Sequence, residues 1–178
     1  MLTAASQHRF DLPQRMVLMG VAGCGKSSVG AALARRIGAV YLDGDDLHPA
    51  ANIAKMSRGV PLSDEDRWPW LTRVGEALAA GAGPTIIGCS ALKRAYRDHI
   101  TSVGGAPVTF IHLVGSVEVI EKRMRVRQGH FMPTALLASQ FAALEPPGAD
   151  ENAISVDIDQ PLEAIVDSIA TQLGGTER

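Results

Sequence analysis

The stretch Gly20-Val21-Ala22-Gly23-Cys24-Gly25-Lys26-Ser27 decides the fold of this chain. It matches the pattern G-x-x-x-x-G-K-[S/T] in full, and it lies between an apolar run at 15–20 and a segment of helical period at 26–37. Glycines let successive backbone N–H groups turn toward a phosphate, and the start of the helix presents its positive dipole end to the same anion. The sequence therefore predicts a nucleoside triphosphate site at this loop.

Within the loop, Lys26 is expected to reach the β- and γ-phosphates, and the Ser27 hydroxyl is expected to ligate Mg²⁺. The residues predicted to contact ATP here are Gly20, Val21, Ala22, Gly23, Cys24, Gly25, Lys26, Ser27 and Ser28. The loop predicts nucleotide binding, but it leaves open what is done with the nucleotide.

Outward from the loop, short apolar runs alternate with segments of helical period. The runs at 39–42, 85–89, 108–113 and 153–156 predict four further strands, and helices are predicted between them and at 162–173. Strands that alternate with helices pair in parallel through right-handed crossovers. We therefore predict an α/β three-layer sandwich with a five-stranded parallel sheet, in one domain (15–178) after a loose tail (1–14).

The segment 47–82 has a helical pattern with Pro49, Gly59, Pro61 and Pro69 inside it. These residues predict two or three helices separated by turns, which we assign to acceptor binding.

The composition is that of an ordinary globular domain. The chain has 178 residues, 46% of them hydrophobic, and a formal net charge of −2, which gives no indication of a nucleic-acid partner. Cys24 and Cys89 have neither a disulfide framework nor metal-ligand spacing. No apolar run is long enough to cross a bilayer, and the first fourteen residues do not resemble a secretory signal. A cytoplasmic protein with no membrane partner is expected.

Three classes of protein share such a loop. A GTPase switch is expected to carry N-K-x-D and D-x-x-G segments, and this sequence contains neither. A motor or large ATPase is expected to have a longer core and an acidic residue after an apolar strand, whereas the third strand here ends in Cys89-Ser90. A small-molecule kinase needs only a short chain, an acceptor pocket and a cationic lid, and the remaining segments favour that class.

Acidic residues follow the second predicted strand, in Asp43-Gly44-Asp45-Asp46. The carboxyl ends of parallel strands form the edge where such sheets bind ligands. Alternation along an extended segment would aim Asp43 and Asp45 the same way, so one carboxylate could hold a Mg²⁺-bound water while the other accepts a proton from an attacking hydroxyl. The alternative is a purely structural turn, with an aspartate capping the next helix.

Basic residues follow successive strands, as expected for a site that handles phosphates and anionic acceptors. Any one of them could instead be a solvated surface cation. Arg123 and Arg127 are i and i+4 on a predicted helix, so they share a face and could form a lid over the nucleotide at about 123–135, with Gly129 as a hinge.

Several segments together make the chain resemble the gluconokinases of the shikimate-kinase-like group. They are the loop, DGDDLHP at 43–49, NIAKM at 52–56, GVPL at 59–62, DEDRWPWL at 64–71, CSALKR at 89–94, YRD at 96–98, GHFM at 129–132, SQF at 139–141, LE at 144–145 and VDIDQP at 156–161.

The resemblance implies phosphorylation of D-gluconate on its 6-hydroxyl by ATP with Mg²⁺, and a homodimer. It implies that Asp45 is the base, that Asp43 orients the Mg²⁺ shell, and that Asp159 and Pro161 wall the adenine. With Asp45, the expected catalytic residues are Lys26 and Arg127, while Arg123 and Arg127 would cover ATP. The residues expected to contact gluconate are Asp45, His48, Lys55, Arg58, Arg67, Lys93, Arg97 and His130.

Other readings remain open. A kinase of the same fold could take shikimate, a nucleoside monophosphate or adenylylsulfate as its acceptor. A nucleotide-binding regulatory protein is a rival from another class. From the residues alone, without the resemblance, the prediction is a kinase of a small, anionic, hydroxylated acceptor.

Overall fold

A parallel sheet forms the centre of the molecule. The computed structural model describes residues 11–105, 107–126 and 134–174. Within them the strands are β1 (Arg15–Met19), β2 (Val40–Asp43), β3 (Thr85–Gly88), β4 (Thr109–Val114) and β5 (Ala153–Asp157). All neighbouring pairs are parallel, in the order β2-β3-β1-β4-β5. The predicted five-stranded parallel sheet is confirmed, and its strand ends agree with the predicted ones to within about one residue.

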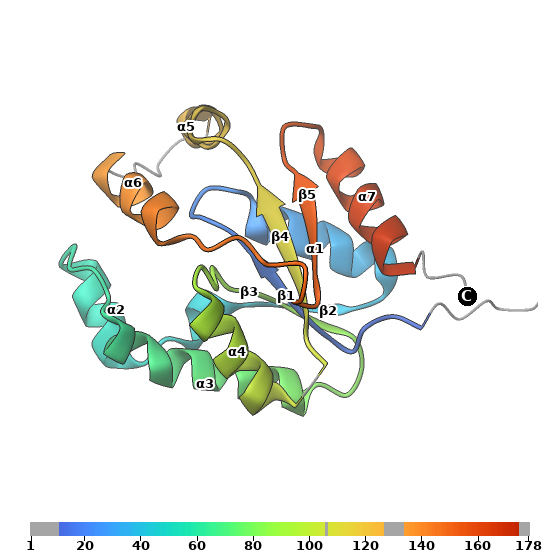
Figure 1. Cartoon of the computed structure of the whole chain (residues 1–178), viewed down its shortest axis with the longest axis horizontal. Coiled ribbons are helices and arrows are strands. Elements are labelled where there is room, and N and C mark those ends of the chain that lie inside the picture. Colours follow the sequence, from blue (N-terminus) through green and yellow to red (C-terminus); the bar gives the residue numbers. More distant parts are fainter. Residues whose placement is uncertain (1–10, 106, 127–133, 175–178) are drawn as a thin grey trace, which may run out of the picture.

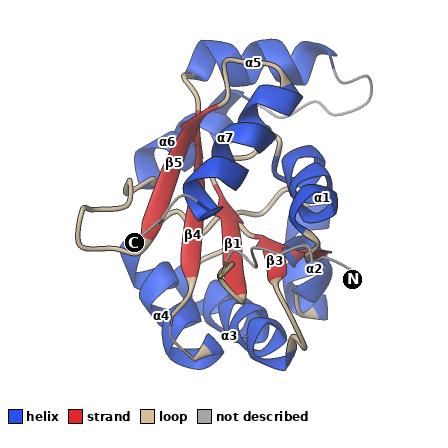
Figure 2. Ribbon diagram, turned by 90° about the vertical axis from the view of Figure 1, so that its right-hand side faces the viewer, coloured by secondary structure: helices blue, strands red, loops and turns tan. Residues whose placement is uncertain are grey.

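Two pairs of helices cover the sheet. Helices α1 (Lys26–Ile37) and α7 (Leu162–Gly174) pack on one face, while α3 (Asp64–Ala80) and α4 (Arg94–Gly104) pack on the other (Figures 1 and 2). Alternate residues of β1 serve the two cores, because successive side chains of a strand point to opposite faces. Met16 and Leu18 belong to the α1–α7 core, whereas Val17 and Met19 belong to the α3–α4 core. This arrangement confirms the predicted three layers.

The remaining helices lie beyond the carboxyl ends of the strands (Figure 1). They are the short 3₁₀ helix η1 (Gly44–Leu47), α2 (Ala50–Ser57), α5 (Val117–Val126) and α6 (Thr134–Ala143). Together with the loop between β1 and α1 they surround the edge of the sheet at which parallel α/β folds bind ligands.

Pro69 does not break the helix in which it lies. A turn was predicted there, but α3 runs without interruption from Asp64 to Ala80. Proline removes one backbone hydrogen bond, here to the carbonyl of Glu65 in the first turn. Both residues are exposed, so water can satisfy that carbonyl. The capping box at Ser63, whose hydroxyl accepts a hydrogen bond from the backbone N–H of Asp66, further stabilises the start of the helix.

The longest described helix, α3, has 17 residues. Among the described parts of the chain, no helix combines the length and the apolar character that crossing a membrane requires.

Candidate active site

The phosphate loop connects β1 to α1 and has the conformation that its glycines permit. Gly23 and Gly25 have φ angles of +81° and +98°, in the left-handed region that side chains disfavour. Lys26 Nζ donates hydrogen bonds to the backbone carbonyls of Gly20, at 3.0 Å, and Val21, at 3.2 Å. The ammonium group is therefore held against the loop at the first turn of α1, where the helix dipole also favours an anion.

The acidic turn begins where β2 ends. Asp43 lies opposite Gly88 in the parallel pairing of β2 with β3. Its Oδ1 accepts a hydrogen bond from the backbone N–H of Asp45 at 2.9 Å and so caps η1. Asp43 thus has the capping contact that the structural alternative predicted, while its role toward Mg²⁺ stays a prediction. A carboxylate has two oxygens, so capping through Oδ1 is compatible with a second interaction through Oδ2.

Asp45 is exposed in this turn, with 84% of its side chain accessible. Desolvation, followed by the negative charge of Asp43, raises the pKa of Asp45 above its ordinary value, while the charges of His48 and Lys26 oppose the rise. The acidic turn and the phosphate loop both contact the end of β3, since Gly44 packs against Gly88 and the backbone N–H of Gly20 donates to the carbonyl of Ser90 at 3.3 Å. An acceptor hydroxyl could reach this carboxylate from solvent.

His48 is not available to the acceptor, contrary to prediction. It is 7% exposed, and its ring stacks on Trp70 with centroids 4.1 Å apart. Its Nδ1 lies 3.3 Å from Asn52 Nδ2, and its Nε2 lies 4.0 Å from Asp45 Oδ1. Burial lowers the pKa of His48, which favours the neutral ring. Trp70 also donates from Nε1 to the carbonyl of Gly44 at 2.8 Å, so this stack supports the turn that carries Asp45.

Two of the predicted acceptor cations are neutralised by carboxylates at the start of α3. Lys55 Nζ lies 2.7 Å from Asp66 Oδ2, and Lys93 Nζ lies 3.2 Å from Asp64 Oδ1. The hydrogen bond from Lys55, followed by that from the Ser63 backbone, lowers the pKa of Asp66 to about 2. An anionic acceptor that engages either lysine therefore has to compete with an aspartate.

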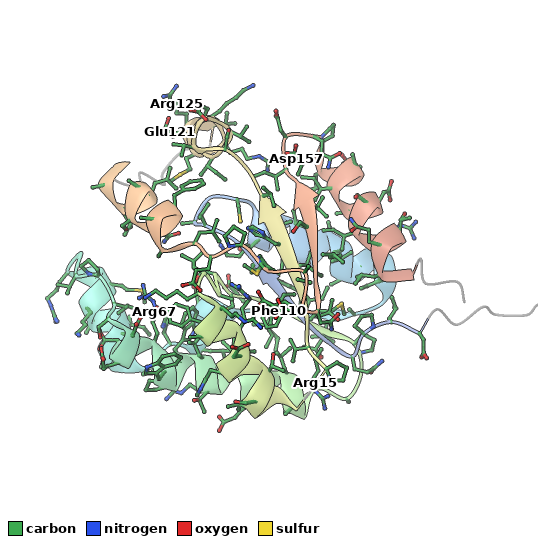
Figure 3. All side chains as sticks on the ribbon, viewed as in Figure 1. Arg15, Arg67, Phe110, Glu121, Arg125 and Asp157 are labelled. Carbon is green, nitrogen blue, oxygen red and sulfur yellow. The ribbon has the colours of Figure 1, made fainter. Side chains whose placement is uncertain are left out.

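Arg67 and Arg58 have no such carboxylate. Arg67 projects from α3 (Figure 3), donates to Tyr96 Oη at 3.4 Å and stands 5.8 Å from the centre of that ring. Tyr96 in turn donates to Asp64. Arg58 is exposed at the end of α2. In the part of the chain that the structure describes, neither guanidinium has a carboxylate within ion-pair distance. Both can therefore take an external anion without breaking an ion pair described in the structure.

Arg97 belongs to the core instead of the acceptor site, which corrects the prediction. Its side chain is 1% exposed, and its Nε and Nη2 donate to the two carboxylate oxygens of Glu151 at 2.7 and 3.0 Å. Its Nη1 donates to the backbone carbonyls of Ala91, at 2.9 Å, and Leu92, at 3.2 Å. All three guanidinium nitrogens are thus engaged inside the protein. Arg97 fixes the turn after β3, where Ala91 has an unusual φ of +43°.

Comparisons with known proteins agree with this geometry. A protein-family model described as an AAA domain matches residues 16–147. The thermoresistant gluconokinase of Escherichia coli is 49% identical over 156 residues, which cover 85% of this chain and 89% of the relative. The crystal structure of a gluconokinase from Sinorhizobium meliloti superposes with a TM-score of 0.82 at 44% identity, over 94% of this chain and 99% of that one.

This chain belongs to the gluconokinase family. A second solved structure, the shikimate kinase of Aquifex aeolicus, covers 90% of this chain and 96% of its own at 19% identity, with a TM-score of 0.60. At this identity the likeness shows only that the two proteins share a fold.

Arg123, which was predicted to belong to a lid, lies on α5 of this gluconokinase-family chain. Arg123 donates from Nη2 to the backbone carbonyl of Ile158 and approaches that of Gln160 at 3.5 Å, so it bridges α5 to the turn after β5. Arg125, two residues further on, points outward from the molecule (Figure 3). The predicted lid and acceptor residues Arg127 and His130 lie outside the described residues.

The two residues predicted to wall the adenine lie in the turn that Arg123 contacts. The backbone N–H of Asp159 donates to Asp157 Oδ1 at 2.8 Å, and the carbonyl of Pro161 accepts from Ile165 at the start of α7 at 3.1 Å. The backbone of this turn is therefore fixed by its own hydrogen bonds. Its nucleotide contacts stay a prediction.

Gln140 on α6 is a contact of the phosphate loop that sequence reasoning missed. Its Oε1 accepts a hydrogen bond from the backbone N–H of Ala22 at 2.6 Å. A glutamine within an apolar helix has no motif of its own, and the two residues are 118 positions apart. Nothing in the single sequence pairs them.

Proposed function

We propose that this chain transfers the γ-phosphoryl group of ATP to the 6-hydroxyl of D-gluconate, giving 6-phospho-D-gluconate and ADP. The similarity to gluconokinases over nearly the whole chain carries the proposal. The acidic turn with Asp45 and the phosphate loop with Lys26 supply the chemistry, because both lie at the carboxyl end of β3.

In the proposed reaction Asp45 accepts the proton of the 6-hydroxyl as its oxygen bonds to the γ-phosphorus. The bond between that phosphorus and the β–γ bridging oxygen breaks, and ADP leaves with the electron pair. Lys26 and backbone N–H groups of the loop stabilise the charge on the phosphates. His48 and Trp70 hold the turn from behind, which keeps Asp45 oriented.

The residues present fit a magnesium ion bound together with the nucleotide. Ser27 is exposed in the first turn of α1, and Asp43 is the last residue of β2. Among the described residues there is no cluster of three or more side chains that could hold a metal alone. Mg²⁺ does not require one, since it usually keeps several waters and takes phosphate oxygens. Bound here it would neutralise charge on the β- and γ-phosphates.

Arg67 and Arg58 are the proposed partners of the acceptor carboxylate. Among the described residues, neither arginine has a carboxylate within ion-pair distance, whereas Lys55 pairs with Asp66 and Lys93 pairs with Asp64. Those lysines are better placed to bind acceptor hydroxyls, since neutral oxygens accept a hydrogen bond without displacing an aspartate.

The function is tested by measuring ADP release from ATP and Mg²⁺ in a coupled assay with gluconate, shikimate, AMP, adenylylsulfate or no acceptor. Release only with gluconate is the expected result. Release with another acceptor would keep the phosphate loop and overturn the choice of acceptor. Nucleotide binding without any acceptor-dependent release would favour a regulatory protein.

Replacing Arg67 with glutamine is expected to raise the KM for gluconate by about 10- to 100-fold, because a hydrogen bond to a charged group contributes about 1.5–3 kcal/mol. The KM for ATP should change little. Arg35→Gln, an exposed arginine at the end of α1, removes the same charge away from the acceptor side and should leave both constants unchanged. Equal gluconate KM values for the wild-type and Arg67→Gln proteins would exclude Arg67 as the carboxylate partner.

Two further features remain proposals. The homodimer follows from the family resemblance, and sedimentation or light scattering of the purified protein would test it. The cytoplasmic location rests on the sequence, and cell fractionation would test it.

A further inference from the structure

One buried hydroxyl in the described part of the chain lacks a hydrogen-bond partner. It is Oη of Tyr41, the second residue of β2. Buried polar atoms in native proteins are nearly always hydrogen-bonded, and an exception calls for an explanation. Tyr41 has no part in the reaction proposed above.

The ring of Tyr41 is held in place by two glycines. A side chain on Gly30 of α1 would come within 2.2 Å of Tyr41 Cε2, and one on Gly88 of β3 would come within 2.4 Å of Oη. Tyr41 pairs in register with Ile86, whereas its hydroxyl reaches Gly88, two residues further along β3. The side chain therefore leans along the sheet toward its carboxyl edge, where the phosphate loop lies.

Ser27 is the polar group on that side. It precedes Gly30 by three residues in α1, so the two share a face of the helix, and that face packs on the Tyr41 ring. Desolvation raises the pKa of the Tyr41 hydroxyl, and a hydrogen bond with Ser27 opposes that rise. The carboxylates of Asp43, Asp45 and Asp46 also act on this hydroxyl.

We propose that Tyr41 is a positioning residue for the metal ligand Ser27: its Oη accepts the hydrogen of the Ser27 hydroxyl, so that a lone pair of Ser27 Oγ is directed at Mg²⁺. A serine hydroxyl has one hydrogen and two lone pairs. A serine that ligates a cation is oriented best when its hydrogen has an acceptor on the side away from the metal. The inference rests on the magnesium site proposed above.

The test is Tyr41→Phe, which removes the hydroxyl and keeps the ring between its glycines. We expect the affinity of the ADP-bound protein for Mg²⁺, measured by calorimetric titration of the metal, to fall by about three- to tenfold, the range of a single neutral hydrogen bond. The thermal unfolding midpoint of the protein free of nucleotide and metal should change little, because the variant loses at most the single neutral hydrogen bond with Ser27.

Two comparisons make the result specific. Tyr96→Phe removes the hydroxyl of the only other tyrosine in the sequence, outside the metal site, and should leave Mg²⁺ affinity unchanged. In a Ser27→Ala background Tyr41→Phe should have no further effect on Mg²⁺ affinity, because the positioned oxygen is gone.

Each other outcome is decisive. Unchanged Mg²⁺ affinity in Tyr41→Phe, with a loss in Ser27→Ala, would overturn the role of Tyr41 and keep the metal site. An equal loss from Tyr41→Phe in both backgrounds would overturn the action through Ser27. Unchanged affinity in Ser27→Ala would overturn the metal site itself. A marked fall in the unfolding midpoint of the unliganded Tyr41→Phe protein would overturn the positioning role in favour of a structural one.

Discussion

Asp45→Asn is expected to lower kcat by about 10²–10⁴-fold, the usual contribution of a general base. Asparagine keeps the size and exposure of the side chain but cannot accept the proton of the attacking hydroxyl. ATP affinity should change little, because the carboxylate acts on the acceptor. Steady-state kinetics with gluconate and a direct measurement of nucleotide binding separate the two effects. An activity within a few-fold of the wild type would exclude Asp45 as the base.

The pH profile gives a second measurement on the same residue. A base works only when deprotonated, so kcat/KM should fall as the pH drops through the pKa of Asp45. Desolvation and the charge of Asp43 raise that pKa, so the fall should begin at a higher pH than for an ordinary aspartate. Asp46→Asn changes the same charge on the neighbouring exposed residue of η1 and should stay within a few-fold of wild-type activity.

Arg97→Met is expected to lower the free energy of unfolding by about 3–5 kcal/mol, because removing one partner of a buried ion pair leaves the other charge uncompensated. Glu151 would lose both of its guanidinium hydrogen bonds, and the carbonyls of Ala91 and Leu92 would lose theirs. Equilibrium unfolding in urea measures the loss. Adding Glu151→Met should recover part of it, since the stranded carboxylate is then removed as well.

Arg94→Met is the matched control for this loss. Arg94 lies on the same helix and pairs with Asp150 at 2.7 Å, but both side chains are largely accessible. Such exposed pairs contribute at most about 1 kcal/mol. A comparable loss in the two variants would contradict the structural role of Arg97. Arg97→Lys keeps a positive charge in the core and should leave the KM for gluconate within a few-fold of the wild-type value. If Arg97 were a ligand of gluconate, the same replacement would raise this KM.

The order of strands and helices could be predicted from the sequence because each element carries its own local signal. The loop residues fix the junction of β1 and α1, and apolar runs of four to six residues mark the strands. Pro69 is the exception, since a proline close to the start of a helix and exposed to solvent removes only one backbone hydrogen bond. The local sequence did not reveal that Pro69 would be exposed.

The site was predicted less completely, because several of its residues depend on partners far away in the chain. Arg97 and Glu151 are 54 residues apart, and Lys93 and Asp64 are 29 apart. Arg97 and Lys93 look alike in sequence, since both are basic residues that follow β3. Arg97 is nevertheless buried in the core, whereas Lys93 pairs with Asp64 at the start of α3. His48 was expected to contact the acceptor because of the family resemblance, and only the stack on Trp70 shows that it is enclosed.

The central position of β1 has a consequence for synthesis of the protein. This strand is synthesised before β3 and β4, its neighbours in the sheet, and Arg15 pairs with Thr85, 70 residues later. At the rate of about 5–20 residues per second of a translating ribosome, on the order of 4–14 s pass before the first neighbour exists. During that time the apolar strand and the phosphate loop behind it have no sheet to join. The nascent chain thus carries its nucleotide-binding motif before the sheet that positions this motif can form.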